Sequence, residues 1–240
     1  MASKSTIEWT EATWNPVTGC DHVSNGCDHC YAERMARRLH AMGNARYRNG
    51  FRLTVHEDLF EVPLRWREPR LIFVNSMSDL FHEQVPLGAI EEVFRTMNRA
   101  HWHTFQVLTK RPMRLRQLAD KLEWTPNIWM GVTVESYRYT HRIEALRSTP
   151  AKIKFVSFEP LLSGIPDDTS LEGIDWAIVG GESGPGARPM MPEWATDLRT
   201  LCRQYGTAYF FKQWGGFNKK AAGRVLDGRT YDEMPSPVIG

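Results

Sequence analysis

The sequence predicts an α/β fold: an incomplete parallel barrel of six or seven strands, with its helices outside. Short β-rich runs alternate with helical stretches along the chain, a pattern typical of parallel strands joined by crossover helices. Nearly every predicted strand ends in polar residues. With 240 residues and 42% hydrophobic content, the chain can form one domain with a sizeable core. We expect the barrel to span residues 1–216, and residues 217–240 to extend the same domain.

The β-rich runs that we take as strands are 13–19, 70–76, 104–110, 127–135, 152–160, 175–183 and 207–215. Helical stretches lie after or between them, at 30–42, 87–100, 112–122, 136–149 and 192–206. Proline or glycine stands at most of the junctions, as expected where helices start and stop. No linker or low-complexity tract divides the chain.

Composition excludes several classes of protein. The longest apolar runs fall far short of the roughly 20 residues that cross a bilayer, so we expect no membrane partner. We identify no secretory leader at the amino end, and four cysteines in 240 residues are too few for a disulfide scaffold, which indicates a reducing cytoplasm. A net charge of +2 is too small to require a nucleic-acid partner.

Three of the four cysteines lie within eleven residues: Cys20, Cys27 and Cys30. Thiolates this close together can bind one inorganic centre. A structural zinc site normally has four protein ligands, and His22 or His29 could complete one here. Iron–sulfur clusters normally take four cysteines, so three would leave one iron open to a small molecule. The remaining cysteine, Cys202, lies far away in a predicted helix. Spacing alone leaves cluster, zinc and unligated thiols as alternatives.

Polar side chains follow most of the predicted strands. Candidate cofactor-binding residues at these ends are Asn75, Ser76, Asp79, Thr133, Glu135, Glu159, Gly180, Gly181 and Glu182. Because active sites of parallel barrels gather beyond the carboxyl ends of the strands, we expect these residues to share one rim with the cysteines. Lys110 and Lys212 are candidates for pairing with a carboxylate or phosphate of a ligand; pairing with a rim carboxylate of the protein is the alternative.

The stretch TGCDHVSNGCDHCYAERM resembles the radical S-adenosylmethionine superfamily, in which three cysteines after the first barrel strand hold a 4Fe-4S cluster. The superfamily's usual spacing is C-x3-C-x2-C, whereas this chain has C-x6-C-x2-C. The segments TWNPVTGC, GCDHCYAERMARRL, VNSMSDLF, FEPLL and VGGESGPGARPM resemble a small, phage- and bacteria-associated three-cysteine family distantly related to spore photoproduct lyase. This closer resemblance extends to about residue 216.

The resemblance implies that Cys20, Cys27 and Cys30 ligate a 4Fe-4S cluster whose open iron binds S-adenosylmethionine. One electron from an external donor such as flavodoxin or ferredoxin would then generate a 5′-deoxyadenosyl radical, which takes a hydrogen atom. The Gly180–Glu182 segment resembles glycine-rich strand ends that approach the cofactor, although the superfamily's similar signature usually falls on an earlier strand.

Basic and aromatic residues point to an anionic substrate. Between Tyr31 and Arg70 the chain has nine arginines against five acidic residues. Trp66, between Arg65 and Arg67, is a candidate platform for stacking a base. We therefore expect the substrate to be a nucleic-acid base or nucleotide, as in phage-type DNA modification or repair. Two alternatives remain: a zinc-stabilised nucleic-acid-binding module without catalysis, and a structural protein whose thiols are incidental.

Overall fold

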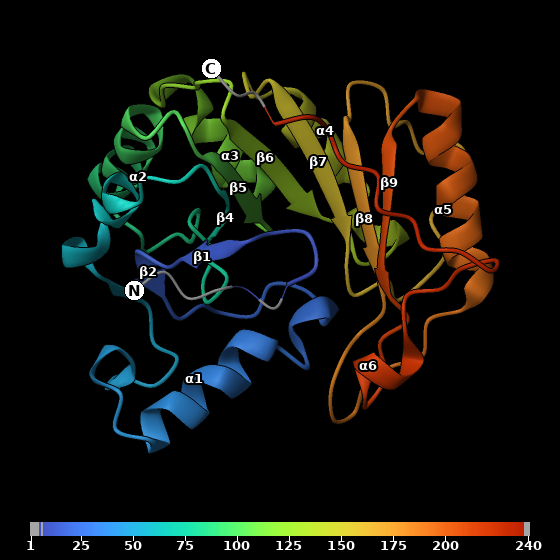
Figure 1. The fold of residues 1–240 in the computed structure, drawn as a ribbon, viewed down its shortest axis with the longest axis horizontal. Coiled ribbons are helices and arrows are strands. Elements are labelled where there is room, and N and C mark those ends of the chain that lie inside the picture. The colour runs from blue at the N-terminus through green and yellow to red at the C-terminus, as the bar shows by residue number, and fades with distance from the viewer. Residues whose placement is uncertain (1–4, 6, 238–240) are drawn as a thin grey trace.

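Seven parallel strands form one curved sheet that does not close. They are β1 (Ala12–Trp14), β4 (Leu71–Val74), β5 (Thr104–Thr109), β6 (Ile128–Thr133), β7 (Ile153–Phe158), β8 (Trp176–Gly180) and β9 (Ala208–Gln213). They lie side by side in this order, and every neighbouring pair is parallel. Figure 1 shows the resulting arc, with β1 and β9 at its two edges. Each strand overlaps one predicted run, so the predicted incomplete parallel barrel is confirmed.

The computed structural model describes residue 5 and residues 7–237. The described part leaves out residues 1–4, 6 and 238–240. These include part of the amino-terminal segment in which we identified no leader, and the end of the predicted extension 217–240.

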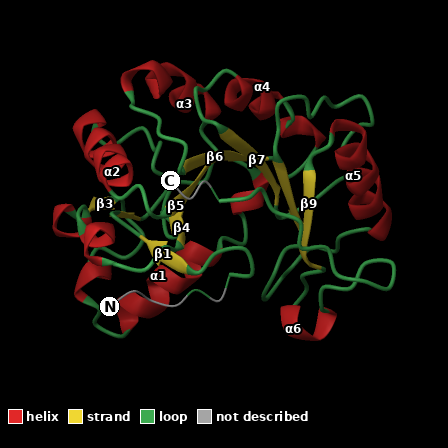
Figure 2. Cartoon of the chain, turned by 45° about the horizontal axis from the view of Figure 1, so that its top comes forward, coloured by secondary structure: helices red, strands yellow, loops and turns green. Residues whose placement is uncertain are grey.

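Helices cover the outer face of the arc. They are α2 (Leu87–Arg99), α3 (Pro112–Leu118), α4 (His141–Arg147) and α5 (Pro192–Tyr205), seen as an outer ring in Figure 2. Below the open side of the arc lies α1 (Tyr31–Ala41), and α6 (Lys219–Ala222) follows β9. All five predicted helices are present, but α3 and α4 are shorter than expected. A 3-10 turn, Ala119–Lys121, follows α3, and another, Tyr137–Tyr139, precedes α4.

The first predicted strand is split in two. β1 ends at Trp14, and β2 (Val17–Thr18) pairs in the antiparallel sense with β3 (Thr54–Val55), a two-stranded ribbon that the sequence did not reveal. Pro16 stands between the two strands and has no N–H to donate to a sheet. Beside it, Asn75 adopts a left-handed conformation at φ 59° and accepts a hydrogen bond from Val17 N through its side chain.

The two faces of the sheet have different cores. Ile128, Met130 and Val132 of β6 belong to the large core between sheet and helices. The concave face carries a separate inner cluster, made of Trp9, Trp129, Phe155, Trp176, Ile178 and Phe210. Gly131 leaves room for this cluster, because a Cβ there would lie 2.5 Å from the Phe155 ring. The amino-terminal half of the half-barrel is thus filled with aromatic side chains.

The segment after α6 returns to the open edge of the sheet. Phe211 N of β9 donates to Tyr231 O at 2.9 Å, and Trp176 Nε1 donates to Glu233 O at 2.9 Å. The ring of Tyr231, edge-on to Tyr209, is buried in the outer core. Edge strands expose unpaired backbone groups, and here the returning chain covers part of them.

Candidate functional site

The concave face becomes polar toward the carboxyl ends of the strands, which we call the carboxyl rim. Side chains alternate along a strand, so Thr133, Ser157 and Lys212 face the same side as Trp129, Phe155 and Phe210. Thr133 and Ser157 are buried, and Lys212 Nζ lies 2.5 Å from Glu159 Oε1. The rim therefore combines two buried hydroxyls with an ion pair above an aromatic floor.

The cysteine loop, residues 20–30, begins directly after β2 and crosses this rim. Gly19 forms a parallel bridge with Ser78, beyond the end of β4, and this bridge brings Cys20 to the carboxyl end of the sheet. A 3-10 turn, Asn25–Cys27, follows, and Cys30 caps the start of α1. The three cysteines of the loop are free and half-buried. The cysteines thus lie at the carboxyl side, as predicted, but they follow the short strand β2 and not the first strand of the barrel.

Cys20 lies against a buried arginine. Arg111 Nη1 is 3.5 Å from the Cys20 sulfur, and Arg111 Nε donates to Glu83 Oε2 at 2.7 Å. Burial, and then the charge of Asp79, raise the pKa of the Cys20 thiol to about 11, although Arg111 acts in the opposite direction. The Asp79 carboxylate also accepts hydrogen bonds from Thr109 Oγ1 at 2.7 Å and from the backbone N–H of Lys110 at 2.9 Å. Arg111 Nη1 also lies 3.5 Å from Asp79 Oδ2, so Arg111 links Asp79 to Cys20.

Glu135, just beyond β6, is fully buried beneath the loop. Its Oε2 accepts a hydrogen bond from Arg142 at 2.8 Å, and its Oε1 accepts one from Ser24 at 2.5 Å. Lys110 Nζ lies 3.7 Å from the same Oε1. Gly26 packs so closely that a Cβ there would lie 2.5 Å from Oε1 of Glu135. The structure therefore brings Lys110 and Glu135 together under the loop.

Glu182, beyond β8, is the second buried carboxylate that touches the loop. Arg188 donates to both of its oxygens, from Nη2 at 2.5 Å and from Nε at 2.9 Å, and His29 Nδ1 lies 3.0 Å from Oε2. Burial alone would raise its pKa, but the hydrogen bonds from Arg188 and His29 lower the pKa of Glu182 to about 2. Glu182 is therefore a carboxylate at any physiological pH.

The other predicted rim residues also lie at the carboxyl ends. A Cβ at Gly181 would collide with the carbonyl of Trp214, so only glycine fits there, whereas a Cβ at Gly180 would lie 3.4 Å or more from its neighbours. Ser76 Oγ lies 3.2 Å from Asn15 Oδ1. In the described part of the chain, the buried Nδ2 of Asn75 has no hydrogen-bond partner. Asn75 thus retains an unpartnered buried amide, and Gly181, unlike Gly180, is required by packing.

The predicted stacking platform lies at the other end of the molecule. Arg65, Trp66 and Arg67 precede β4, so they lie at the amino ends of the strands, opposite the cysteine loop. The Arg70 guanidinium lies 5.3 Å from the centre of the Trp66 ring, and Trp102 Nε1 donates to Trp66 O at 2.8 Å. The structure does not bring these residues to the rim, because they stand before a strand and not after one.

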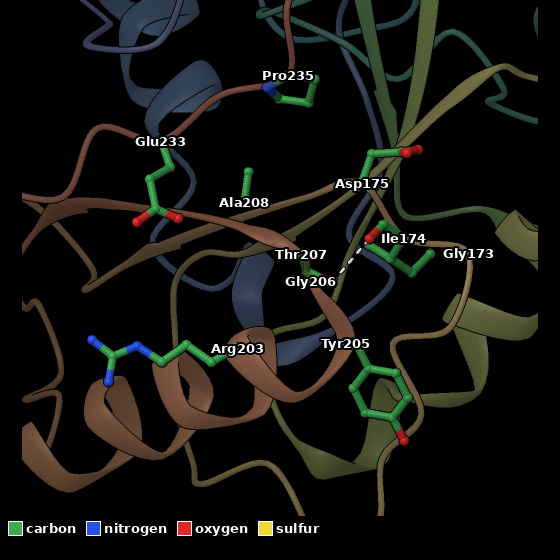
Figure 3. Close-up of a pocket in the computed structure, with 10 residues that line it drawn as sticks. All are labelled: Gly173, Ile174, Asp175, Arg203, Tyr205, Gly206, Thr207, Ala208, Glu233 and Pro235. Atoms are coloured by element: carbon green, nitrogen blue, oxygen red, sulfur yellow. Dashed lines mark hydrogen bonds between the residues drawn. The ribbon is translucent and has the colours of Figure 1, made fainter.

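A surface cavity of about 660 Å³ also lies at the amino end, next to β8 and β9 (Figure 3). Asp175, Thr207 and Glu233 line it, together with Arg203 near the end of α5. Asp175 and Glu233 already accept backbone hydrogen bonds, from Lys154 N at 2.8 Å and Tyr209 N at 2.9 Å. This cavity is therefore separate from the cysteine loop, which lies at the carboxyl ends of the strands.

Comparison with known proteins identifies the family. The model of the family "Protein of unknown function (DUF5131)" matches residues 4–235. The chain belongs to this family. No curated protein matches the sequence.

Solved structures similar to this chain are complexes of spore photoproduct lyase. One is a variant with bound AdoMet and dinucleoside spore photoproduct: 13% identity, TM-score 0.49, covering 86% of this chain and 64% of that protein. Another, complexed with dinucleoside spore photoproduct, has 14% identity, a TM-score of 0.47 and the same coverage. This chain thus spans about 64% of the length of the lyase. At this identity and overlap, the similarity identifies no activity for the chain.

The cysteine loop offers one thiol fewer than the four that an iron–sulfur cluster normally takes. Its three free thiols belong to one loop, and Cys27 lies near enough to contribute, after burial and Asp79, to the raised pKa of Cys20. Among the residues that the structure describes, no group of three or more Cys, His, Asp or Glu side chains is arranged to hold a metal ion. Ligation of one centre therefore requires these side chains to turn toward one another. Cys202 is buried in α5, where burial raises its pKa to about 12.

The arginines that contact the rim carboxylates were not among the residues predicted from the sequence. Arg142 lies on α4 and Arg188 follows β8, and each lies seven or fewer positions from its carboxylate. Arg188 and Glu182 both lie in the segment VGGESGPGARPM, so their short separation in the sequence could have predicted the ion pair. Ser24 carried no such signal, because it is 111 positions from Glu135.

In the part of the chain that the structure describes, no helix has both the length and the apolar character needed to cross a membrane.

Proposed function

We propose that this protein is a radical S-adenosylmethionine enzyme that binds a 4Fe-4S cluster through Cys20, Cys27 and Cys30. The observation that carries the proposal is the position of these free thiols, on a loop that crosses the carboxyl rim of a parallel half-barrel. Three local thiols fall one short of the usual four cluster ligands, which leaves an iron open to a small molecule. The sequence resemblance to the superfamily supports the same conclusion.

In this proposal, S-adenosylmethionine binds on the polar concave face between the inner cluster and the cysteine loop. Thr133, Ser157 and Glu159 offer oxygen atoms for its amine and ribose hydroxyls, and Lys212 offers a cation for its carboxylate. The glycine at 180 permits a close approach of backbone. The aromatic floor excludes water from below, which protects reactive species from quenching.

When bound, the cofactors supply a reductive cleavage of S-adenosylmethionine into methionine and 5′-deoxyadenosine. The electron comes from an external donor such as flavodoxin or ferredoxin, and the hydrogen atom comes from the substrate. The chain's own residues then hold the reacting groups in place and keep solvent out.

The substrate in this proposal is a nucleic-acid base or nucleotide, as in phage-type DNA modification or repair. Support comes from arginines that follow the cysteine loop in sequence and are exposed: Arg37, Arg38, Arg46, Arg48 and Arg52. Two of them pair with acids, at Glu33 and Asp58. Because Arg65 and Arg67 lie at the amino end, these five are better placed to guide an anionic substrate to the rim.

A zinc-stabilised binding module is the second candidate, and one observation favours it. His22 and His29 flank the cysteines, and each ring hydrogen-bonds a carboxylate, at Glu33 and Glu182 respectively, with distances of 3.0 Å. Zinc-ligating histidines commonly have a carboxylate partner of this kind.

Metal analysis under anaerobic conditions separates the two functions. We expect about four iron and four sulfide per chain after reconstitution with iron and sulfide. Replacing Cys20, Cys27 or Cys30 with Ala should abolish iron binding, whereas Cys202→Ala, the matched control, should retain it. Adding S-adenosylmethionine should change the electron paramagnetic resonance signal of the reduced cluster, and reductant should then yield 5′-deoxyadenosine. One tightly bound zinc with no sulfide would contradict the proposal.

A further inference from the structure

Two buried carboxylates hold the cysteine loop from beneath. The first is Glu135, where Ser24 Oγ donates at 2.5 Å and Gly26 leaves no room for a Cβ. Arg142 fixes this carboxylate, since its Nη1 donates both to Oε2 of Glu135 at 2.8 Å and to Thr133 O at 2.7 Å. A buried carboxylate held in this way is rigid and presents its other oxygen to the loop.

The second anchor is the pair of Glu182 and Arg188. Arg188 holds Glu182 with two hydrogen bonds and also reaches the loop, from Nη2 to Asn25 O at 2.7 Å and from Nη1 to Asp28 Oδ2 at 3.2 Å. His29 Nδ1 lies 3.0 Å from the same Glu182. This anchor therefore contacts the loop at three residues.

The Glu135 anchor contacts the loop before the middle cysteine, Cys27, and the Glu182–Arg188 anchor contacts it on both sides of Cys27. Ser24, Asn25 and Gly26 lie between Cys20 and Cys27, and Asp28 and His29 lie between Cys27 and Cys30. The first of these two gaps is the longer one, in which this chain has six residues where the superfamily it resembles usually has three. This longer gap holds Ser24, which contacts Glu135, and Asn25, whose backbone carbonyl accepts a hydrogen bond from Arg188.

We infer that Glu135 and the Glu182–Arg188 pair are positioning residues that dock the cysteine loop across the carboxyl rim, with the Ser24–Gly26 segment as the docking surface. The inference rests on the proposed function only for the identity of the cluster that the loop would bind. It also changes the cofactor assignment: Glu135 and Glu182 bind the loop, and the concave residues Thr133, Ser157 and Glu159 remain for S-adenosylmethionine.

Hydrogen–deuterium exchange of the full-length chain, without iron, tests the docking directly. Gly26→Ala should force the loop off Glu135, and Arg188→Ala should remove the second anchor. Each should raise exchange at residues 20–31 by about tenfold or more, with exchange in α5 unchanged, because local opening then precedes global unfolding. Arg188→Lys should restore part of the protection. Gly88→Ala on α2, where a Cβ meets nothing within 4 Å, and Arg99→Ala, at an exposed pair with Glu61, are matched controls.

Unchanged exchange at residues 20–31 in both Gly26→Ala and Arg188→Ala would overturn the inference. If Gly26→Ala does not fold, Ser24→Ala removes one hydrogen bond to Glu135 and gives the same test. A second measurement, the rate at which a chelator removes iron from the reconstituted protein, should rise severalfold in the anchor variants and not in the controls. Failure of the wild-type chain to load iron would contradict the proposed function but leave the exchange result, and hence the docking, intact.

Discussion

Replacing Glu182 with Gln should remove a pH-dependent part of the free energy of unfolding. Hydrogen bonds from Arg188 and His29, outweighing burial, lower the pKa of Glu182 from 4.5 to about 2. Each pKa unit corresponds to about 1.4 kcal/mol, so the ionised carboxylate contributes about 3 kcal/mol to folding. Because the folded pKa is the lower one, this contribution is complete above about pH 4.5 and is lost as the pH falls toward 2.

Urea unfolding of wild type and Glu182→Gln between pH 7 and pH 3 measures this contribution. By linkage, about 2 kcal/mol of it is lost by pH 3, so the stability difference between the two proteins should shrink by that amount. Since the Arg188 side chain is 31% exposed, solvent screens the ion pair, and the change of about 2 kcal/mol is an upper bound. Glu144→Gln is the control: Glu144 pairs with Arg147 at the surface, and its replacement should cost less than about 1 kcal/mol at every pH. A stability difference for Glu182→Gln that stays constant from pH 7 to pH 3 would refute the reasoning.

Two further predictions concern packing and thiol reactivity. Gly131→Ala should lower the free energy of unfolding by about 1–3 kcal/mol, because its Cβ would meet the Phe155 ring, whereas Gly88→Ala should raise it by up to about 1 kcal/mol. Urea unfolding of both variants checks this, and equal effects would contradict it. Cys202 should react with iodoacetamide only after unfolding, because it is buried and burial raises its pKa to about 12, whereas Cys27 and Cys30, which are half-buried, should react in the folded chain. Mass spectrometry locates the label, and rapid labelling of Cys202 in the folded protein would be the contrary result.

Local sequence patterns were sufficient to predict the strands and the outer helices. The β6 stretch, for example, is recognisable because six consecutive residues, Ile128–Thr133, are all buried in the structure and apolar or small in the sequence. The ends of α3 and α4 were less predictable, since the periods of a 3-10 turn and an α-helix, about 3.0 and 3.6 residues, differ too little to be told apart over a single turn. The split after β1 depended on Pro16, which the sequence displays, and on the left-handed conformation of Asn75, which it does not.

The sequence by itself determined the parallel half-barrel, and it placed the cysteines after the run 13–19, at the end of the sheet to which the first strand runs. Only the tertiary structure decided which groups the rim carboxylates contact. Glu135 meets Ser24 across 111 positions and Glu182 meets His29 across 153, and contacts this distant in the chain depend on how the strands are arranged in space. The same reason placed Trp66 at the amino end: a strand carries residues before it to one end of the sheet and residues after it to the other.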